Sequence, residues 1–162
     1  MLYFSYGSNM SSKRLRKRIP AARLGVGKLY EHELRFHKES NNDGSAKCDA
    51  HNTGNSSHLI YGVVYEISEI HKTVLDEFEG LGFGYEIKNV QIHVEDTTIS
   101  AFTYYATQIN VNLKPLHWYK KHVLIGAHEN ALPDFYIQQI EKINSVADVD
   151  VNRHKKELKI YH

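Results

Sequence analysis

Two short segments, far apart in the chain, carry residue types that could do chemistry together. Tyr6-Gly7-Ser8-Asn9 follows an apolar stretch, and a Gly-Ser-Asn turn at the end of a buried strand exposes consecutive backbone N–H groups. Glu79 stands at the end of an expected helix, directly before the glycine-rich turn Gly80–Gly84. Amide donors can hold an oxyanion or a carboxylate, and a carboxylate can accept and return a proton. If the two segments meet in the fold, they would form an active site that sets the Glu79 carboxylate against the turn.

A third segment, Tyr119 to Pro133, contains an apolar helical stretch that is expected to run to about His128. Gly126 within it indicates close packing against another element, and Tyr119 could project its hydroxyl into a cleft. Each segment taken alone also has a purely structural interpretation. The first is then an ordinary strand-to-helix turn, Glu79 a solvated carboxylate like Glu77, and the third segment a core helix.

Strands are expected to build the scaffold that positions these segments. Leu59–Ile67 is nearly continuous in β-branched and aromatic residues, which is typical of a strand in the middle of a sheet. Gly25 and Gly27 lie inside another strand-like stretch and indicate bends or bulges, so the sheet is expected to curve or close. The remaining strands are predicted at residues 2–6, 22–37, 85–95 and 98–106, the last two as a hairpin.

Helices are expected to flank this sheet. Ser68 can cap a helix in which Ile70, Val74 and Phe78 recur at helical spacing and share one face. A short basic helix after the first strand and two helices in the last third complete the pattern. Strands and helices do not alternate, so the order favours an α+β domain with a strongly bent mixed sheet or small barrel over a doubly wound parallel sheet.

The composition is that of one globular domain with little net charge. The chain has 162 residues, of which 41% are hydrophobic and 24% charged, and these values exclude a disordered protein. Lys plus Arg is 20 and Asp plus Glu is 19, a balance that argues against a dedicated nucleic-acid binder. The basic run Lys13–Arg18 is either a solvated helix face or a patch that attracts an anion.

No compartment signal or metal signature stands out. Cys48 is the single cysteine, so no internal disulfide can form and nothing indicates an oxidising compartment. The N-terminus lacks the basic region of a signal peptide, and no apolar run reaches the roughly 18 residues of a membrane span. We therefore expect a cytoplasmic protein without a membrane partner. The spacings among the eleven histidines match no metal-ligand motif, so we expect no metal site.

Four motifs, in order and in spacing, resemble the γ-glutamylcyclotransferase family. Each is common alone, but the four together are specific, and the resemblance covers about residues 1–144. The motifs are Phe4-Ser5-Tyr6-Gly7-Ser8-Asn9-Met10, Gly62-Val63-Val64-Tyr65, Leu75-Asp76 with Glu79-Gly80, and a C-terminal set of Tyr119-Lys120-Lys121, Gly126-Ala127, Glu129 and Leu132-Pro133.

The resemblance implies a fold, a reaction and a set of residues. The fold is a small mixed, Greek-key-like β-barrel with flanking helices. The reaction converts γ-glutamyl amino acids or amines into 5-oxoproline and a free amine, within glutathione metabolism and without metal or organic cofactor. The family's catalytic glutamate falls on Glu79, and its C-terminal binding tyrosine on Tyr119. Its substrate-cradling loop falls on Tyr6, Gly7, Ser8, Asn9, Met10 and Ser11.

Several points stay open at this stage. Many family members have Tyr then Arg after the glycine-rich turn, whereas Glu86 follows Tyr85 here, which leaves the exact substrate open. A homodimer is compatible with the resemblance. The alternatives to an enzyme are a non-catalytic small-molecule binding protein on the same fold and a nucleic-acid-binding module using Lys13–Arg18.

The C-terminal tail, residues 145–162, has no family counterpart that the motifs place. We treat it as separate from the domain of residues 1–144. Its apolar pairs, Val149–Val151 and Leu158–Tyr161, could each form a short edge strand.

Overall fold

Strand β5 (Leu59–Glu66) lies at the centre of the sheet. In the computed structural model, which describes residues 1–162, β5 pairs antiparallel with β1 (Leu2–Ser5) on one side and β2 (Ala22–Tyr30) on the other. Val63 and Val64 are fully buried because both faces of a central strand meet other elements. The prediction of a central strand at this position is confirmed.

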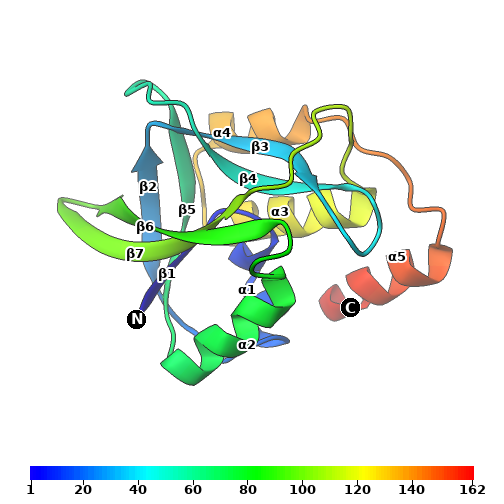
Figure 1. Ribbon diagram of the computed structural model, residues 1–162, viewed down its shortest axis with the longest axis horizontal. Coiled ribbons are helices and arrows are strands. Elements are labelled where there is room, and N and C mark those ends of the chain that lie inside the picture. The colour runs from blue at the N-terminus through cyan, green and yellow to red at the C-terminus, as the bar shows by residue number, and fades with distance from the viewer.

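The hairpin of β6 (Tyr85–Val94) and β7 (Thr97–Ala106) closes the sheet into a barrel of order β1-β5-β2-β6-β7 (Figure 1). Strand β6 pairs with β2, and β7 meets β1 in parallel at Tyr3 and Phe102. The predicted hairpin and the predicted α+β fold with a small mixed barrel are therefore confirmed.

Strand β2 carries the curvature that its glycines predicted. Its pairing register with β5 shifts between Arg23 and Gly25, which marks a bulge. Gly27 serves a different purpose: a Cβ there would lie 2.3 Å from Cγ2 of Ile92, so glycine allows β6 to approach β2.

Strands β3 (His32–Glu39) and β4 (Ala46–Asn52) form a two-stranded ribbon beside the barrel (Figure 1). Glu31 has a φ of 62° and turns the chain, so the single strand predicted over residues 22–37 is two strands. The Ala106 amide donates a 2.7 Å hydrogen bond to Oδ1 of Asp49 and fastens the ribbon to β7.

Helix α2 (Glu69–Glu79) begins as predicted, because the Ser68 hydroxyl accepts a hydrogen bond from the amide of His71. The apolar face of Ile70, Val74 and Phe78 is not the face that packs on the barrel. Ile70 is 77% exposed and Phe78 is 54% exposed, while Val74 is partly buried. The helix touches the barrel mainly through fully buried Leu75, which lies between the predicted positions. Helical spacing of apolar residues does not reveal which stripe meets the barrel.

Helix α3 (His117–Glu129) packs directly on the short 3-10 helix η1 (Ser8–Met10), and α4 (Asp134–Glu141) packs on α3. A Cβ at Gly126 would lie 2.6 Å from Cβ of Met10, so only glycine permits this contact. The predicted close packing at Gly126 is confirmed. None of the helices combines the length and hydrophobicity that crossing a bilayer requires.

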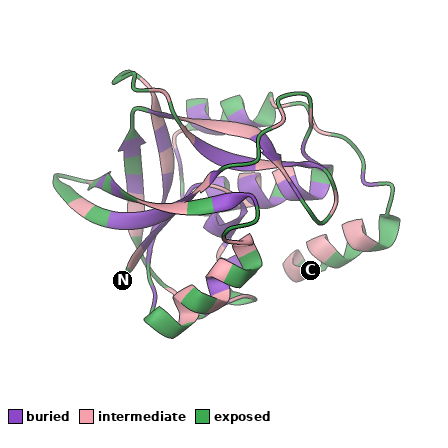
Figure 2. Cartoon of the chain, in the orientation of Figure 1, coloured by how far each residue is buried: buried purple, intermediate pink, exposed green.

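The tail is helical, so the predicted edge strands are wrong. It forms α5 (Val151–Leu158) and a 3-10 turn, η2 (Lys159–Tyr161). The Asp150 carboxylate accepts a 2.9 Å hydrogen bond from the amide of Arg153, and this N-cap outweighs the strand preference of the neighbouring valines. Figure 2 shows that α5 has no buried residue, whereas the strands and α3 carry long buried stretches.

Candidate active site

The carboxylate of Glu79 lies against the Tyr6–Asn9 turn. Glu79 is the last residue of α2, and Gly80 ends the helix in the left-handed conformation, with a φ of 69°. One carboxylate oxygen accepts hydrogen bonds from Nδ2 of Asn9 at 2.8 Å and from a guanidinium nitrogen of Arg18 at 2.6 Å. The helix C-terminus repels a negative charge, and these two donors offset that repulsion. The side chain is only 17% exposed, so Glu79 is not an ordinary solvated glutamate.

The start of η1 supplies amide donors. The N–H groups of Ser8 and Asn9 stand in the first turn of the 3-10 helix, where no intrahelical carbonyl can accept from them. A side chain at Gly7 would place its Cβ 3.1 Å from Cβ of Cys48 and 3.6 Å from the hydroxyl of Tyr119. Glycine at this position therefore keeps the space between the turn and Tyr119 open.

These groups surround a small cavity of about 30 Å³, which is room for about one or two water molecules. The structure brings six predicted residues to its wall: Tyr6, Gly7, Ser8, Asn9, Glu79 and Tyr119. Ser8, Glu79, Tyr85 and Tyr119 also line a cleft of about 780 Å³. The small cavity is therefore the inner end of a much wider cleft.

Two tyrosines fix the cavity wall through the backbone of Cys48. The amide of Cys48 donates to the Tyr119 hydroxyl oxygen at 3.0 Å, and the Tyr85 hydroxyl donates to the Cys48 carbonyl at 2.5 Å. Burial raises the pKa of Tyr119 well above its ordinary value, so the hydroxyl keeps its proton. The Tyr119 hydroxyl donates no hydrogen bond to another protein nitrogen or oxygen.

Cys48 lies on the cavity wall but is not a nucleophile. Burial raises the pKa of its thiol to about 12, so almost no thiolate is present near neutral pH.

Met10 and Ser11 do not line the cavity or the cleft, although both were predicted to bind substrate. Both are fully buried against other elements. The Met10 carbonyl accepts hydrogen bonds from the Tyr65 hydroxyl and the Asn130 side chain. The Ser11 hydroxyl accepts from the amide of Arg14 and so caps α1 (Ser12–Arg16). Continuity of the loop motif does not place every one of its residues at the site.

Other wall residues were not predicted. Tyr3, Ser5, Tyr85 and Tyr104 line the cavity because barrel closure brings β1, β6 and β7 together. The Ser5 hydroxyl is 1% exposed and has no hydrogen-bond partner in the protein. Aromatic residues alternating in a strand indicate a core face, and nothing in that pattern reveals a cavity behind it.

Arginines of the basic run serve the site. Arg18 pairs with Glu79, and Arg14 donates to the Ser8 hydroxyl at 3.1 Å and pairs with Glu157 at 2.7 Å. The sequence indicated a patch that attracts anions, but not these partners. A nucleic-acid-binding surface would have to use the remaining exposed side chains, Lys13, Arg16 and Lys17.

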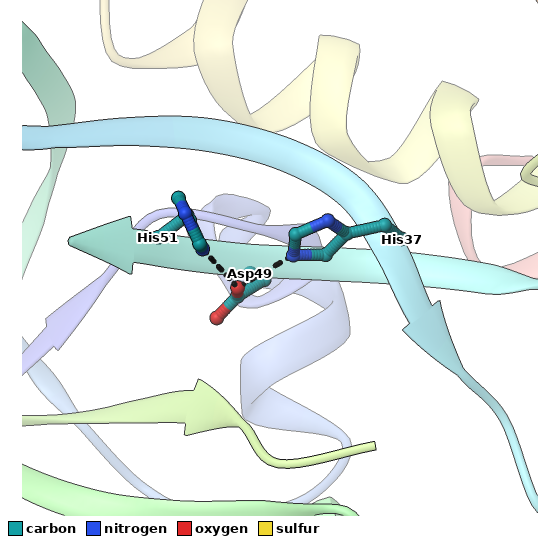
Figure 3. Close-up of side chains that lie close together, drawn as sticks. All are labelled: His37, Asp49 and His51. Carbon is teal, nitrogen blue, oxygen red and sulfur yellow. Dashed lines mark hydrogen bonds and ion pairs between the residues drawn. The ribbon is translucent and has the colours of Figure 1, made fainter. Parts of the chain in front are cut away.

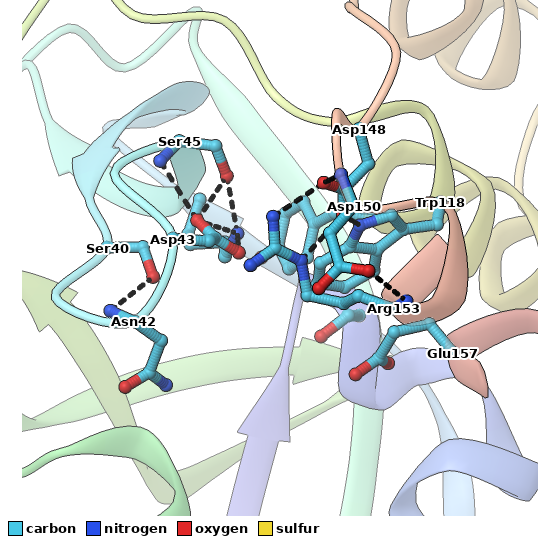
Figure 4. A network of polar contacts seen from close by, with 12 residues as sticks. Ser40, Asn42, Asp43, Ser45, Trp118, Asp148, Asp150, Arg153 and Glu157 are labelled. Atoms are coloured by element: carbon cyan, nitrogen blue, oxygen red, sulfur yellow. Dashed lines mark hydrogen bonds and ion pairs between the residues drawn. The ribbon is translucent and has the colours of Figure 1, made fainter. Parts of the chain in front are cut away.

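The tail forms one side of the cleft. Arg153 of α5 pairs with Asp148, which also accepts a hydrogen bond from the Trp118 indole (Figure 4). Asp43 and Ser45, in the loop between β3 and β4, face this network from the other side (Figure 4). The cleft is thus shaped by the tail as well as by the barrel.

Glu86, which stands where many family members have arginine, lies outside the site. Glu86 is exposed on β6 and lines neither the cavity nor the cleft, whereas Tyr85 before it points into both. The change from the family pattern at this position therefore leaves the cavity wall unchanged.

A separate group of possible metal ligands lies on the β3–β4 ribbon. His37 and His51 flank Asp49, with nitrogen-to-Oδ2 distances of 2.7 and 3.7 Å (Figure 3). Two imidazoles and a carboxylate suit zinc or a similar divalent ion. Sequence spacing could not predict this group, because the register of the antiparallel ribbon creates it. None of the three residues lines the cavity or the cleft.

Comparison with known proteins places this barrel and cavity in a family. The AIG2-like family matches residues 59–140, which include β5, the Glu79 helix end and α3. The γ-glutamylcyclotransferase of Homo sapiens is 30% identical over 150 residues, covering 88% of this chain and 78% of the human protein. The γ-glutamylcyclotransferase of Bos taurus is 28% identical over 158 residues, covering 92% of this chain and 80% of the bovine protein.

Solved structures agree. A γ-glutamyl cyclotransferase structure superposes with a TM-score of 0.87 at 26% identity, covering 98% of each chain. That coverage extends into the tail, for which the sequence motifs gave no counterpart. The chain belongs to the γ-glutamylcyclotransferase family and is an enzyme of that family.

Proposed function

We propose that this enzyme cyclises a γ-glutamyl amino acid or amine to 5-oxoproline and releases the amine, with Glu79 as the general base and acid. One observation carries the proposal: the Glu79 carboxylate lies 2.8 Å from Asn9, in the turn whose amides border the same cavity. The reaction needs a proton carrier and oxyanion donors side by side, and this cavity supplies both.

The chemistry requires one base and no side-chain nucleophile. The α-amine of the substrate has an ordinary pKa of about 8, so a proton must be removed before its nitrogen attacks the γ-carbonyl carbon. The new C–N bond closes a five-membered ring, and the C–N bond to the leaving amine then breaks. Glu79 accepts the proton from the attacking nitrogen and donates it to the leaving nitrogen.

Neutral donors are proposed to stabilise the intermediate. The amides of Ser8 and Asn9, with the Tyr119 hydroxyl opposite, can hold the tetrahedral oxyanion or the substrate α-carboxylate. Arg18 is a positioning residue, since its 2.6 Å contact orients the Glu79 carboxylate. The small cavity fits only the reacting carbonyl end, and the leaving amine occupies the wide cleft.

Incubation with a set of γ-glutamyl dipeptides and γ-glutamyl amines, followed by mass spectrometry, tests the proposal. Release of 5-oxoproline with equimolar amine is expected from at least one member. Saturable binding without any product would favour a non-catalytic binding protein on the same fold. Salt-sensitive retention on a DNA column without turnover would favour the nucleic-acid alternative.

Activity is expected to survive chelation. The His37–Asp49–His51 group is the one cluster suited to a metal ion, and it lines neither the cavity nor the cleft. Dialysis against EDTA should leave 5-oxoproline release within about twofold of the untreated enzyme, since the proposed steps use proton transfer and hydrogen bonding alone. Loss of turnover that added zinc or manganese restores would contradict this mechanism.

We also propose that the enzyme acts in the cytoplasm, in glutathione metabolism. The single cysteine, which is buried and unpaired, is compatible with a reducing compartment. A homodimer is also compatible with the family resemblance. Light scattering at several protein concentrations would measure the molar mass and test it.

A further inference from the structure

Lys38 is a buried cation without an anionic partner. Its residue is 5% exposed, and its side chain crosses the space above Gly84, with Nζ 3.0 Å from where a Cβ would stand. The ammonium lies 4.7 Å from the ring centroid of Tyr85. Lysines are almost never buried to this degree unless they are paired, because a buried charge without a counterion is costly.

Every other buried or half-buried cation in the cleft has its counterion. Arg18 pairs with Glu79, Lys47 with Asp43, Arg14 with Glu157, and Arg153 with Asp148, at distances of 2.5 to 2.8 Å. The Lys38 ammonium forms no ion pair and no hydrogen bond. Burial lowers the pKa of Lys38, while the charges of Glu79, Asp43 and Glu39 act on it from beyond ion-pair distance.

The residues that line the cleft together with Lys38 show where Lys38 lies relative to the reacting groups. Lys38 and Tyr85 both line the wide cleft, and Tyr85 with Glu79 also lines the small cavity. An anion bound at Lys38 therefore lies in the cleft beside the reacting group. Lys38 does not line the small cavity that takes the reacting end of the substrate, so the anion at Lys38 belongs to the leaving amine in the wide cleft.

The cleft as a whole favours anions. Seven basic side chains line it against four acidic ones. Lys17 and Lys156 are exposed on its rim without ion pairs, and Glu77 is an exposed rim carboxylate that offsets one of them. A surplus of positive charge beyond Lys38 suits a ligand with more than one negative group.

We propose that Lys38 is the anchor of a carboxylate subsite for the leaving amine, and that the enzyme prefers γ-glutamyl compounds whose leaving amine is an acidic amino acid with two carboxylates. The proposal rests on the cyclisation proposed above. Lys38 binds one carboxylate by a charge-assisted hydrogen bond, and the rim lysines attract the second. The Lys38 ammonium lies over the Tyr85 ring on the cleft wall, where the leaving amine is expected to bind.

Three substrates and two matched variants test this subsite. The substrates are γ-glutamyl-ethylamine, γ-glutamyl-alanine and γ-glutamyl-glutamate, whose leaving amines carry no, one and two carboxylates. Wild type is expected to show kcat/KM rising in that order. Lys38→Met should lower kcat/KM at least about tenfold for γ-glutamyl-alanine and γ-glutamyl-glutamate, whose leaving amines carry a carboxylate. It should leave kcat/KM for γ-glutamyl-ethylamine unchanged. Lys38→Arg should restore part of the preference.

Lys28→Met is the control, because Lys28 also lies over a tyrosine ring, 5.8 Å from the Tyr61 centroid, but is exposed and outside the cleft. It should leave all three values unchanged. The subsite would be overturned if wild type showed the same kcat/KM for all three substrates. It would also be overturned if Lys38→Met kept the wild-type preference for leaving amines that carry carboxylates. If no substrate yields 5-oxoproline, the cyclisation itself fails. Equilibrium binding of γ-glutamyl-glutamate to wild type and Lys38→Met then decides the subsite independently, with at least about tenfold weaker binding expected for the variant.

Discussion

Replacing Glu79 by glutamine is expected to lower 5-oxoproline release by at least about 10²-fold, the lower end of the contribution of general acid–base catalysis. Glutamine keeps the shape of the side chain and an oxygen that can accept from Asn9, but it cannot take up and return a proton. Substrate binding should persist, since the turn amides and Tyr119 are unchanged. The measurement is the single-turnover rate of 5-oxoproline formation at saturating substrate.

Folding of Glu79→Gln should also persist. The glutamine oxygen can still accept hydrogen bonds from Asn9 and Arg18, and losing a negative charge at a helix C-terminus is slightly favourable. Glu69→Gln is the matched control, because Glu69 is exposed on the same helix and lines neither the cavity nor the cleft. A folded Glu79→Gln protein with near-normal turnover would rule out Glu79 as the proton carrier.

The sequence located the centre of the site but not its surroundings. The turn, Glu79 and Tyr119 were predictable because each combines a reactive or hydrogen-bonding group with an element end, where side chains and amides are free to act. Their order matched a family motif, which implied that they meet. Arg18 and Tyr85 were not predicted as partners, because their contacts depend on how the barrel closes and not on local spacing.

The tail and α2 show where local patterns mislead. Valines at 149 and 151 favour a strand, yet the Asp150 carboxylate between them caps a helix. Ile70 and Phe78 have the spacing of a buried face, yet Leu75 alone is fully covered. In both regions the weak local preference was decided by a single contact to a neighbouring element or backbone group.

Gly126→Ala is expected to destabilise the protein and to reduce turnover, although alanine is the better helix former. In an exposed helix the exchange would stabilise by about 0.5–1 kcal/mol. Here the new Cβ would stand 2.6 Å from Cβ of Met10 and 2.6 Å from the amide nitrogen of Ser11. Backbone atoms cannot rotate away as a flexible side chain can, so η1 must move. Overpacking of this kind costs about 1–3 kcal/mol and exceeds the helix-propensity gain.

The shift of η1 carries the effect of Gly126→Ala to the chemistry. Ser8 and Asn9 belong to η1, so a displacement approaching an ångström misaligns their amides and the Asn9 contact to Glu79. Misplacement on that scale can cost about 10²-fold in rate. Thermal melts and kcat of the folded fraction measure the two effects separately. Gly25→Ala is the control, because its Cβ meets only Cγ1 of Val94 at 3.6 Å, an ordinary contact, and activity should be retained. A Gly126→Ala enzyme that is more stable than wild type and fully active would show that α3 does not hold the turn in place.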